Sequence, residues 1–587
     1  MWQLIAFCII CYLVSLAVVK IDTNFDYRWL AFWLHISSIA LILGIYISKT
    51  YARLTLKKIL SEQNLNPLLY ILAITVFVNF LLLPIYPYVS ISDELRDSGL
   101  DTMKIAAGNI KNIFGYGNYD GYGLIVPTLT IPFYYIFNNS TLTYRFFAAL
   151  LSSIDVVLIY LLIRQFIDRK TAFWSAIIIA TLPLHMYFAH TEVVVAFNFF
   201  WVPTILLLFF HLLKQHRLID YIFLGTILGF ACGFHAGIRT FAILILLILL
   251  FLEFKDIILK KIKNGKKILN RLFKLALLIC FIIVGFGPRL LFSDTHNFFH
   301  TTAFALTNKI QTQTPITADD ITTIKHNYIK SLMGYIYEPV AFHYHDYKPI
   351  LSPLLAIFFI LGIIYALFVL KNLFLNIILF ILISLPFLNS AITDITNADH
   401  RLSPSFPISA IFVAIGITFW LNFIKNRWIK YISIAILVFY LLCQVSAFYI
   451  KQPAQYANGL NQYLTMHIWR FLQSEKEYQA SPTINLQYMN SNLHKSPVCL
   501  HLSPSNYQYL NEDIAAIEQK AYLLPAADIQ YSQENYINDN EVFITKNSCS
   551  NKLNYTSTTH TYTISCSSSK NILICPPNYK GDILIHY

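Results

Sequence analysis

The sequence predicts an α-helical polytopic membrane protein. Of its 587 residues, 56% are hydrophobic and only 13% are charged, whereas a typical soluble protein carries about 25% charged residues. Apolar runs of roughly 18 residues or more, long enough to cross a bilayer, recur along the chain. The net charge of +12 comes largely from basic residues in short loops between these runs, as in the cytoplasmic loops of membrane proteins. The composition therefore argues against a soluble enzyme and against a nucleic-acid partner.

About thirteen segments have the length and composition of transmembrane helices. They cover residues 2–19, 29–48, 67–88, 143–163, 171–189, 192–213, 219–237, 238–252, 274–291, 350–370, 373–389, 404–424 and 429–449. The first segment lacks a basic leader and a small-residue cleavage site, so we expect a retained helix rather than a signal peptide. Residues 124–137 are apolar but short and contain two prolines, which predicts a re-entrant or interfacial element on the outer face.

Basic residues predict the orientation. With the N-terminus in the cytoplasm, the inner loops collect Lys and Arg, most densely between residues 253 and 271. An odd number of spans then places the C-terminus outside. We therefore expect an integral protein of the bacterial cytoplasmic (inner) membrane with two long outer segments, 89–142 and 292–349.

The chain divides into three predicted parts. Residues 1–66 form two extra membrane helices and a basic inner loop, and residues 67–449 form the catalytic membrane core. Residues 450–587 are rich in Ser, Asn, Tyr and Thr and predict a small extracytoplasmic α/β domain. Its expected elements are an amphipathic helix over 463–477 and strands over 483–489, 498–502 and 541–545.

An acidic pair, Asp93-Glu94, follows the third apolar segment. Adjacent carboxylates suit general-base chemistry, in which one takes a proton and the other orients the substrate or tunes its neighbour. Arg96 belongs to the same cluster and is a candidate pocket residue. The alternative is a solvated helix start, because Ser92 is a plausible N-cap ahead of acidic residues.

Basic residues at the predicted outer ends of two other membrane segments are candidate phosphate ligands. His400-Arg401 leads into segment 404–424, where the planar guanidinium of Arg401 suits a lipid phosphate; the alternative is an arginine that only anchors the helix end. Arg239, with His235 nearby, is a second phosphate candidate, and its alternative is an ion pair with a carboxylate such as Glu192. Glu192 itself either lines the cavity of Asp93 or belongs to a plain hairpin turn.

Two further features have open interpretations. Asp155 lies in the middle of a predicted span, where it costs about 2.5–3.5 kcal/mol and needs a partner; it serves either an ion pathway or a structural hydrogen bond. The outer segment 292–349 contains the histidines His296, His300, His326, His343 and His345. We expect this segment to shape a substrate groove, with a bound divalent metal as the less favoured alternative.

Several motifs, in order from about Leu68 to Ile424, resemble the GT-C superfamily of membrane glycosyltransferases. They are Asp93-Glu94 after a span, the Gly/Pro stretch 121–132, Tyr144-Arg145-Phe146 opening a span, Leu182-Pro183 closing one, the Gly-rich stretch 229–239 ending in Arg239, and His400-Arg401 followed by spaced prolines. The likeness is greatest to protein O-mannosyltransferases and to the aminoarabinose transferase of lipid A. Departures are the two extra N-terminal spans, Leu402 where the family often has Tyr, and the unmatched C-terminal domain.

The resemblance implies an enzyme that transfers a sugar from a polyprenyl-phosphate-linked donor to a glycan, lipid or protein acceptor, with inversion, on the outer face of the membrane. Asp93 would be the general base and Glu94 its helper. Arg401, His400 and Arg239 would bind the donor phosphate, with Glu192, His235 and Arg96 in the pocket. No cofactor and no metal is expected.

Two other functions stay open at this point. One is a polysaccharide polymerase or ligase with a polyprenyl-diphosphate donor. The other is a lipid or glycan transporter (flippase), which would need charged residues along a path through the membrane. Only Asp155 is clearly mid-span, while the other candidates gather at one face, so surface chemistry is favoured.

Overall fold

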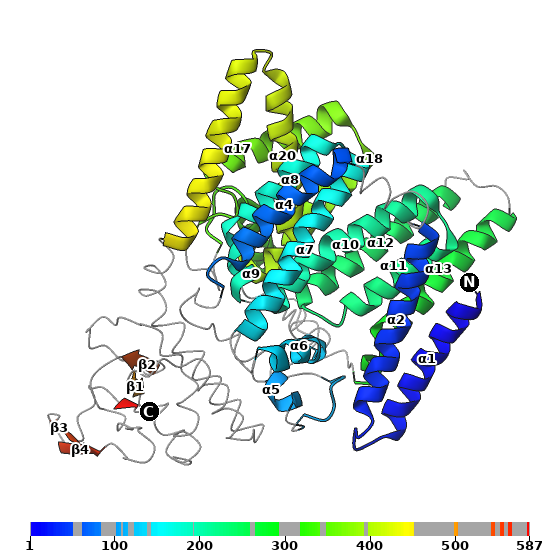
Figure 1. Ribbon diagram of the computed structural model, residues 1–587. Coiled ribbons are helices and arrows are strands. Elements are labelled where there is room, and N and C mark those ends of the chain that lie inside the picture. Colours follow the sequence, from blue (N-terminus) through cyan, green and yellow to red (C-terminus); the bar gives the residue numbers. More distant parts are fainter. Residues whose placement is uncertain are drawn as a thin grey trace.

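The computed structural model describes most of the chain up to residue 450 and five short strands beyond it. The described residues are 2–50, 62–83, 101–106, 108, 110–115, 123–137, 142–191, 193–258, 265–292, 317–340, 348–392 and 397–450, with the strands between residues 498 and 585. Up to residue 450 the described part is mostly helical (Figure 1).

The helices match the predicted spans. Their bounds are α1 Trp2–Ile21, α2 Arg28–Thr50, α4 Glu62–Phe80, α5 Asp101–Ala106, α6 Ile125–Ile136, α7 Leu142–Phe166, α8 Arg169–Thr181, α9 Pro183–Thr191, α10 Val193–Gln215, α11 Leu218–Ala231, α12 Ala236–Ile258, α13 Gly265–Phe286, η2 Gly287–Leu291, α16 Ala318–Met333, α17 Pro353–Tyr365, η3 Ala366–Leu370, α18 Leu373–Pro386, η4 Phe387–Ala391, α19 Asp399–Leu402, η5 Ser403–Ser405, α20 Phe406–Phe423 and a last helix, Arg427–Ile450. Among the described residues, nine helices are long and apolar enough to cross a membrane, or ten if the bent pair α8–α9 is one span. The other three predicted spans correspond to the shorter apolar helices α1, α4 and α11. The predicted α-helical polytopic membrane fold is confirmed.

The predicted span 171–189 is two helices with a break between them. Helices α8 and α9 meet at Leu182 with a bend of 59°. Pro183 has no N–H to continue the ladder of α8, but it fits the first position of a new helix. The break therefore turns α9 into a separate element that carries His185 and His190.

Helix α6 matches the short apolar segment that was expected not to span. Its 12 residues extend about 18 Å, less than the hydrocarbon thickness of roughly 30 Å. The hydroxyl of Thr102 in α5 donates to the carbonyl of Pro127 in α6 at 3.2 Å, which joins these two short helices. The side of the membrane on which they lie remains a prediction.

Glycines allow two pairs of helices to pack at unusually close range. A Cβ on Gly225 or Gly229 of α11 would overlap backbone carbonyls of α13, and one on Gly285 would overlap the carbonyl of Thr226. Gly362 of α17 and Gly416 of α20 make the same kind of crossing. Small residues promote close helix packing in membranes, where apolar burial gives little drive.

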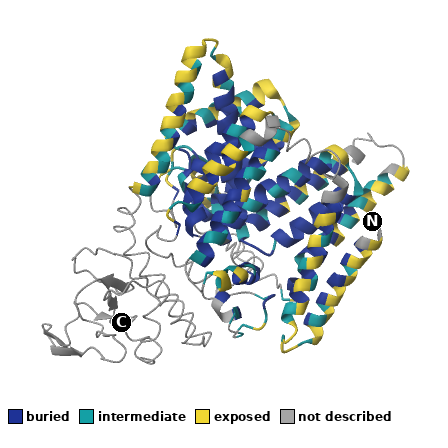
Figure 2. Cartoon of the chain, in the orientation of Figure 1, coloured by how far each residue is buried: buried dark blue, intermediate teal, exposed yellow. Residues whose placement is uncertain are grey.

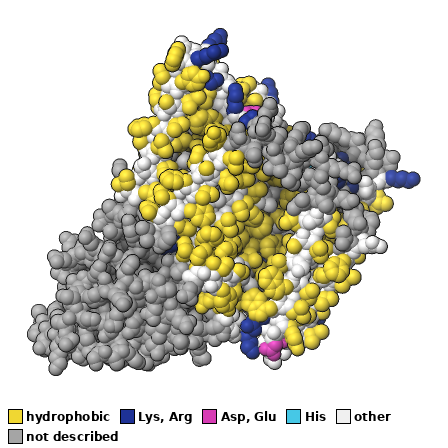
Figure 3. Space-filling model, in the orientation of Figure 1, with side chains coloured by type: hydrophobic (Ala, Val, Ile, Leu, Met, Phe, Trp, Pro, Cys, Tyr) yellow, Lys and Arg dark blue, Asp and Glu magenta, His cyan; other side chains and the backbone are white. Residues whose placement is uncertain are grey.

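Buried side chains concentrate in the helices at the centre of the bundle, and exposed ones lie on the outer helices (Figure 2). The exposed side chains are largely apolar. They include Phe7 and Trp33 in the N-terminal helices and Phe439 in the last helix, and hydrophobic atoms dominate the coloured face in Figure 3. An apolar exterior of this extent is typical of a surface in contact with lipid. The chain is an integral membrane protein.

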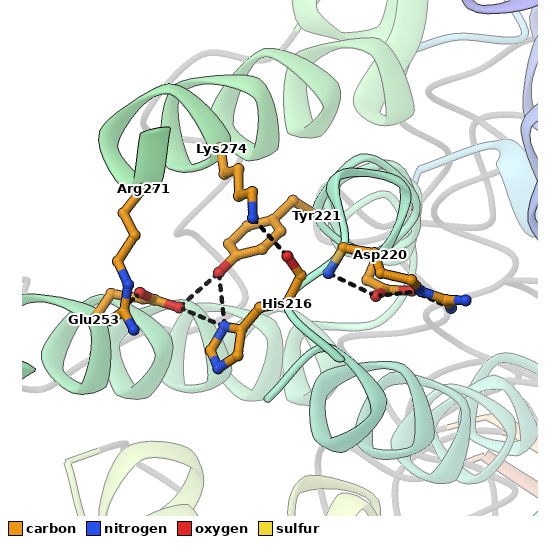
Figure 4. A network of polar contacts seen from close by, with 7 residues as sticks. His216, Asp220, Tyr221, Glu253, Arg271 and Lys274 are labelled. Atoms are coloured by element: carbon orange, nitrogen blue, oxygen red, sulfur yellow. Dashed lines mark hydrogen bonds and ion pairs between the residues drawn. The ribbon is translucent and has the colours of Figure 1, made fainter. Parts of the chain in front are cut away.

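A polar network gathers at the C-terminal end of α12 (Figure 4). Glu253, 2% exposed, accepts a hydrogen bond from the Tyr221 hydroxyl at 2.6 Å and pairs with Arg271 at 3.0 Å and His216 at 3.4 Å. Lys274 Nζ donates to the His216 carbonyl at 2.6 Å. The network ties the turn between α10 and α11 to α12 and α13, at the end that carries the basic loops.

Beyond residue 450 the described elements are strands. They are β1 Val498–Leu502, β2 Val542–Thr545, β3 Lys552–Thr556, β4 Thr561–Ser565 and β5 Leu584–Ile585. Strand β1 pairs antiparallel with β2 and β5, and β3 pairs antiparallel with β4. Strands β1 and β2 match two predicted strands. The predicted helix 463–477 and strand 483–489 lie outside the described residues.

Candidate functional site

The start of α12 brings two predicted site residues into the protein interior. His235 directly precedes the helix and Arg239 lies in its first turn, and both are buried. Arg239 Nε donates to the carbonyl of Cys232, and its Nη2 donates to the carbonyl of Phe234, each at 3.0 Å. These carbonyls follow the end of α11, where backbone acceptors lack partners within the helix and the dipole favours a cation.

A second arginine, Arg289 in η2, reaches the same end of α11. Its Nη2 donates to the carbonyl of Phe230 at 3.3 Å, and its Nε donates to the carbonyl of Phe286 at 3.1 Å. The Arg289 guanidinium occupies the space that a Cβ on Gly233 would fill. Two buried cations therefore converge on the end of α11, and only Arg239 was a sequence candidate.

Segment 397–405 places His400 and Arg401. Asn397 has a left-handed backbone (φ 59°), and its amide Nδ2 donates to the carbonyls of Lys330 and Pro339, each at 3.3 Å. The backbone N of Asn397 donates to the Ser390 hydroxyl, which also receives the hydroxyl of Ser331. The C-terminal part of α16 and the residues after it therefore fix the turn leading into α19.

Within α19, the histidine is more deeply buried than the arginine. Asp399 is fully buried, and its Oδ1 accepts the backbone N–H of His400 at 2.7 Å. His400 is 8% exposed, while Arg401 is half-buried. This difference leaves the Arg401 side chain more accessible to a ligand than that of His400.

The starts of α12 and α19 converge. The imidazole rings of His235 and His400 lie with centroids 5.8 Å apart in an edge-on arrangement. Asn198 Nδ2 donates to His235 Nδ1 at 2.8 Å and to the Ser403 hydroxyl at 2.8 Å. The two predicted basic segments, far apart in sequence, therefore meet at one place in the fold.

Further contacts hold this junction together. The Thr240 hydroxyl in α12 donates to Asn389 Oδ1 in η4. A Cβ on Gly237 would lie 3.0 Å from Pro404 Cγ, so the absence of a side chain at this position allows η5 to approach α12. The junction of α12, α19, η4 and η5 is thus tightly packed.

His190 lies at the end of α9 and is fully buried. Its Nδ1 bonds to the Met186 carbonyl at 2.7 Å and its Nε2 lies 3.3 Å from the Leu81 carbonyl. The Tyr449 hydroxyl is 3.2 Å from the same Nε2 and also donates to the Val78 carbonyl. The end of α4, after which the predicted Asp93-Glu94 follows in sequence, is therefore tied to α9 and to the last helix.

Asp155 has a buried partner. Its Oδ2 lies 3.1 Å from His185 Nε2, and both side chains have 0% exposure. Nearby on α7, the Ser153 hydroxyl accepts a hydrogen bond from Asn79 of α4. The contact with His185 satisfies the expectation that a mid-span carboxylate needs a partner, and it joins α7 to the segment after the Pro183 break.

Comparison with known proteins gives a match to one family model over part of the chain. Residues 124–286, from α6 through α13, match the family model described as dolichyl-phosphate-mannose-protein mannosyltransferase. This part of the chain is similar to protein O-mannosyltransferases. This confirms the resemblance to protein O-mannosyltransferases and supports a glycosyltransferase in general.

Solved structures of GT-C proteins align with much of the chain at low identity. ArnT from Cupriavidus metallidurans, solved with undecaprenyl phosphate, is 13% identical over 78% of this chain and 74% of its own, with a TM-score of 0.37. The Archaeoglobus fulgidus oligosaccharyltransferase in the apo form is 13% identical over 81% of this chain and 61% of its own, with a TM-score of 0.40. A search of curated proteins gives no match.

The stretch that matches the family model contains part of the predicted site. His235 and Arg239 lie within the matched residues, and His400, which precedes Arg401, contacts His235. Asp93, Glu94, Arg96 and Glu192 lie outside the described residues, so their roles stay predictions. Of the outer histidines, only His326 is described; the other four lie outside the described residues.

Sequence reasoning missed Asn198, Ser403, Arg289 and His185. Asn198 carried a usable signal, because an isolated amide in an apolar span needs hydrogen-bond partners. Arg289 carried a weaker signal, as a single cation at the end of a predicted span. The partners of these residues come from distant segments, which a single sequence does not identify.

Proposed function

We propose that this protein transfers a sugar from a polyprenyl-phosphate-linked donor to an acceptor at the outer face of the cytoplasmic membrane. The contact between His235 and His400, each of which has an arginine nearby in the sequence (Arg239 and Arg401), carries the proposal. Cations and hydrogen-bond donors grouped at one end of a membrane bundle suit the phosphate of a membrane-bound lipid. The matched family is named for a sugar donor of this class, dolichyl-phosphate-mannose.

The reaction requires charge to be stabilised on the leaving phosphate. The acceptor hydroxyl loses its proton to Asp93, and its oxygen attacks the anomeric carbon with inversion. The bond between that carbon and the phosphate oxygen breaks, so polyprenyl phosphate leaves with one more negative charge than it had in the donor. Preorganised donors and cations, here Arg401 with His400 and Arg239, lower the energy of such a transition state.

The remaining predicted residues support this chemistry. Glu94 orients the acceptor or holds Asp93 ionised, and Glu192 and Arg96 complete the pocket with His235. Among the described residues, Arg239 donates to the backbone carbonyls of Cys232 and Phe234. We therefore assign it a mainly electrostatic contribution and assign direct phosphate contact to Arg401.

No cofactor is part of the proposal. The phosphate ester of the donor already activates the sugar, so a nucleotide is not needed, and a divalent metal is not invoked. The acceptor class is the open variable, since a glycan, a lipid and a protein all present hydroxyl groups.

The purified protein in liposomes tests the proposal. Defined polyprenyl-phosphate sugars are supplied with glycan, lipid and peptide acceptors, and release of polyprenyl phosphate is measured together with the glycosylated product. Turnover only with diphosphate-linked donors would instead indicate a polymerase or ligase. Movement of intact donor across the bilayer without cleavage would indicate a flippase and would overturn the transferase assignment.

A further inference from the structure

The N-terminal hairpin, α1 with α2, packs against the part of the bundle that carries the two buried arginines. It precedes the residues that match the family model, 124–286. Helix α2 contacts α11, and α1 contacts η2 (Figure 1). His35 of α2 is only 2% exposed. A polar ring buried among membrane helices needs a hydrogen-bond partner.

Pro288 creates that partner. In a continuous α-helix the carbonyl of Val284 would accept the N–H of residue 288, but residue 288 is a proline and has no N–H. His35 Nε2 lies 3.1 Å from this carbonyl. Because a carbonyl only accepts, the ring nitrogen is the donor. His35 thus replaces the helical hydrogen bond that α13 loses where it passes into η2.

Gly287 makes room for the same ring. Its backbone is left-handed (φ 71°), and a Cβ at this position would lie 2.2 Å from His35 Cε1. Both the backbone conformation and the space therefore favour glycine. The turn from α13 into η2 is built around the imidazole of His35.

Arg289 follows this turn directly and shares an aromatic neighbour with His35. Its guanidinium lies 5.4 Å from the ring centroid of Phe230 and 5.3 Å from that of Phe286, within the range of cation–π attraction. The imidazole of His35 stands edge-on to Phe230, with centroids 6.1 Å apart. His35 therefore supports Arg289 through the backbone turn that precedes it and through the ring beneath its guanidinium.

The end of α11 receives this cation next to the candidate site. Arg289 and Arg239 both donate to backbone carbonyls there, and Cys232 lies within electrostatic range of both guanidinium groups. His235, whose ring contacts that of His400, follows three residues later. Charges in a protein interior are screened less than charges in water. Both arginines therefore raise the positive potential where the two basic segments meet.

We propose that His35 is a positioning residue for the transfer reaction, and that it holds Arg289 at the end of α11, where the guanidinium strengthens the binding of the donor phosphate through its positive potential. The inference rests on the proposed function. It makes the N-terminal hairpin part of the functional unit rather than an added membrane anchor. Because the potential acts at a distance, Arg289 needs no contact with the phosphate.

Substitutions at the two residues test the proposal in the purified full chain, titrated with polyprenyl phosphate in detergent micelles. We expect Arg289→Gln to bind roughly tenfold more weakly, as for the loss of one nearby charge. His35→Leu keeps the bulk but not the donor and should bind roughly three- to tenfold more weakly by the same electrostatic argument. His35→Gln should bind like wild type, because its amide NH₂ reaches close to the place of Nε2–H. If His35→Leu does not fold, His35→Asn replaces it, since its shorter amide does not reach the Val284 carbonyl.

The double variant His35→Leu/Arg289→Gln separates positioning from general damage. If His35 acts through Arg289, the double variant binds polyprenyl phosphate no more weakly than Arg289→Gln alone, whereas independent effects would multiply. Trp33→Leu is the matched control, because it changes a side chain of α2 that is 55% exposed. Its affinity should equal that of wild type.

Two results would overturn the inference. One is a His35→Leu variant that binds polyprenyl phosphate as tightly as wild type, and the other is a double variant in which the two losses multiply. A wild-type protein that binds polyprenyl phosphate but transfers no sugar would count against the proposed function alone.

Discussion

Asp155 and His185 form a contact of 3.1 Å between two fully buried side chains. The pair links the middle of α7 to the first turn of α9, just after the break at Pro183. His185 is thus the partner of Asp155, the one candidate carboxylate that the sequence places clearly within a span. A transport pathway therefore has less support, because this carboxylate has a structural partner.

Removing one member of this pair should destabilise the bundle. We expect Asp155→Ala to lower the free energy of unfolding by about 3 kcal/mol, because it leaves a buried polar partner unsatisfied. Denaturation in mixed detergent micelles measures the change. Asp155→Asn keeps the size and one acceptor oxygen and should lose less. Equal stability of Asp155→Ala and wild type would show that the contact contributes nothing.

The crossing of α11 and α13 should not tolerate a methyl group. In Gly229→Ala the new Cβ would overlap the Ile282 carbonyl, so we expect a loss of about 1–3 kcal/mol from overpacking. Gly44→Ala is the matched control, because nothing lies within 4 Å of the added atom in α2. The melting temperature should fall for the first variant and stay level or rise for the second. The close packing would be refuted by two identical melting curves.

The Glu253–Arg271 pair should show measurable coupling. Because Glu253 is buried and also accepts the Tyr221 hydroxyl, a double-mutant cycle with alanine should give about 1–3 kcal/mol. The exposed pair Lys111–Asp26, at 3.6 Å, is the control, and its coupling should be below about 1 kcal/mol. A cycle that gives the same small value for both pairs would contradict the structural role of the network in Figure 4.

Asp93→Asn tests the general base. The variant should lose about 10²–10⁴-fold in kcat, because the amide cannot take the proton of the acceptor hydroxyl. Its affinity for the lipid-linked donor should stay near that of wild type, and its insertion into the membrane should be unchanged. Transfer at the wild-type rate would remove Asp93 from the mechanism and leave Glu94 as the candidate base.

Arg401 tests the phosphate site. Arg401→Ala should raise the apparent KM for the donor roughly ten- to a hundredfold through loss of a charge-assisted hydrogen bond. Arg401→Lys should recover part of this loss, because it keeps the charge but not the planar fork. Lys425→Ala removes an exposed cation after the C-terminal end of α20 and should leave the donor KM unchanged. If Arg401→Ala leaves the apparent KM for the donor unchanged, Arg401 does not bind the donor phosphate.

The sequence by itself determined the class of the molecule. Long apolar runs require helices, since a backbone in lipid must satisfy its hydrogen bonds within the segment. The helical segments of the described chain therefore fall where hydropathy predicts them. The order of the motifs around Arg239 and His400-Arg401 also indicated the resemblance to protein O-mannosyltransferases, which the family model confirms over residues 124–286.

Tertiary structure alone decided which of these residues meet. Periodicity identifies a buried face but not its partner, so the contacts of Asn198 with His235 and Ser403, and of Asp155 with His185, were not readable from the chain. In the sequence, the only sign of the break between α8 and α9 is Pro183 itself. The 59° bend depends on how α9 packs against α4 and α7. Hydrogen bonds between segments hundreds of residues apart are set by helix packing, which local sequence does not encode.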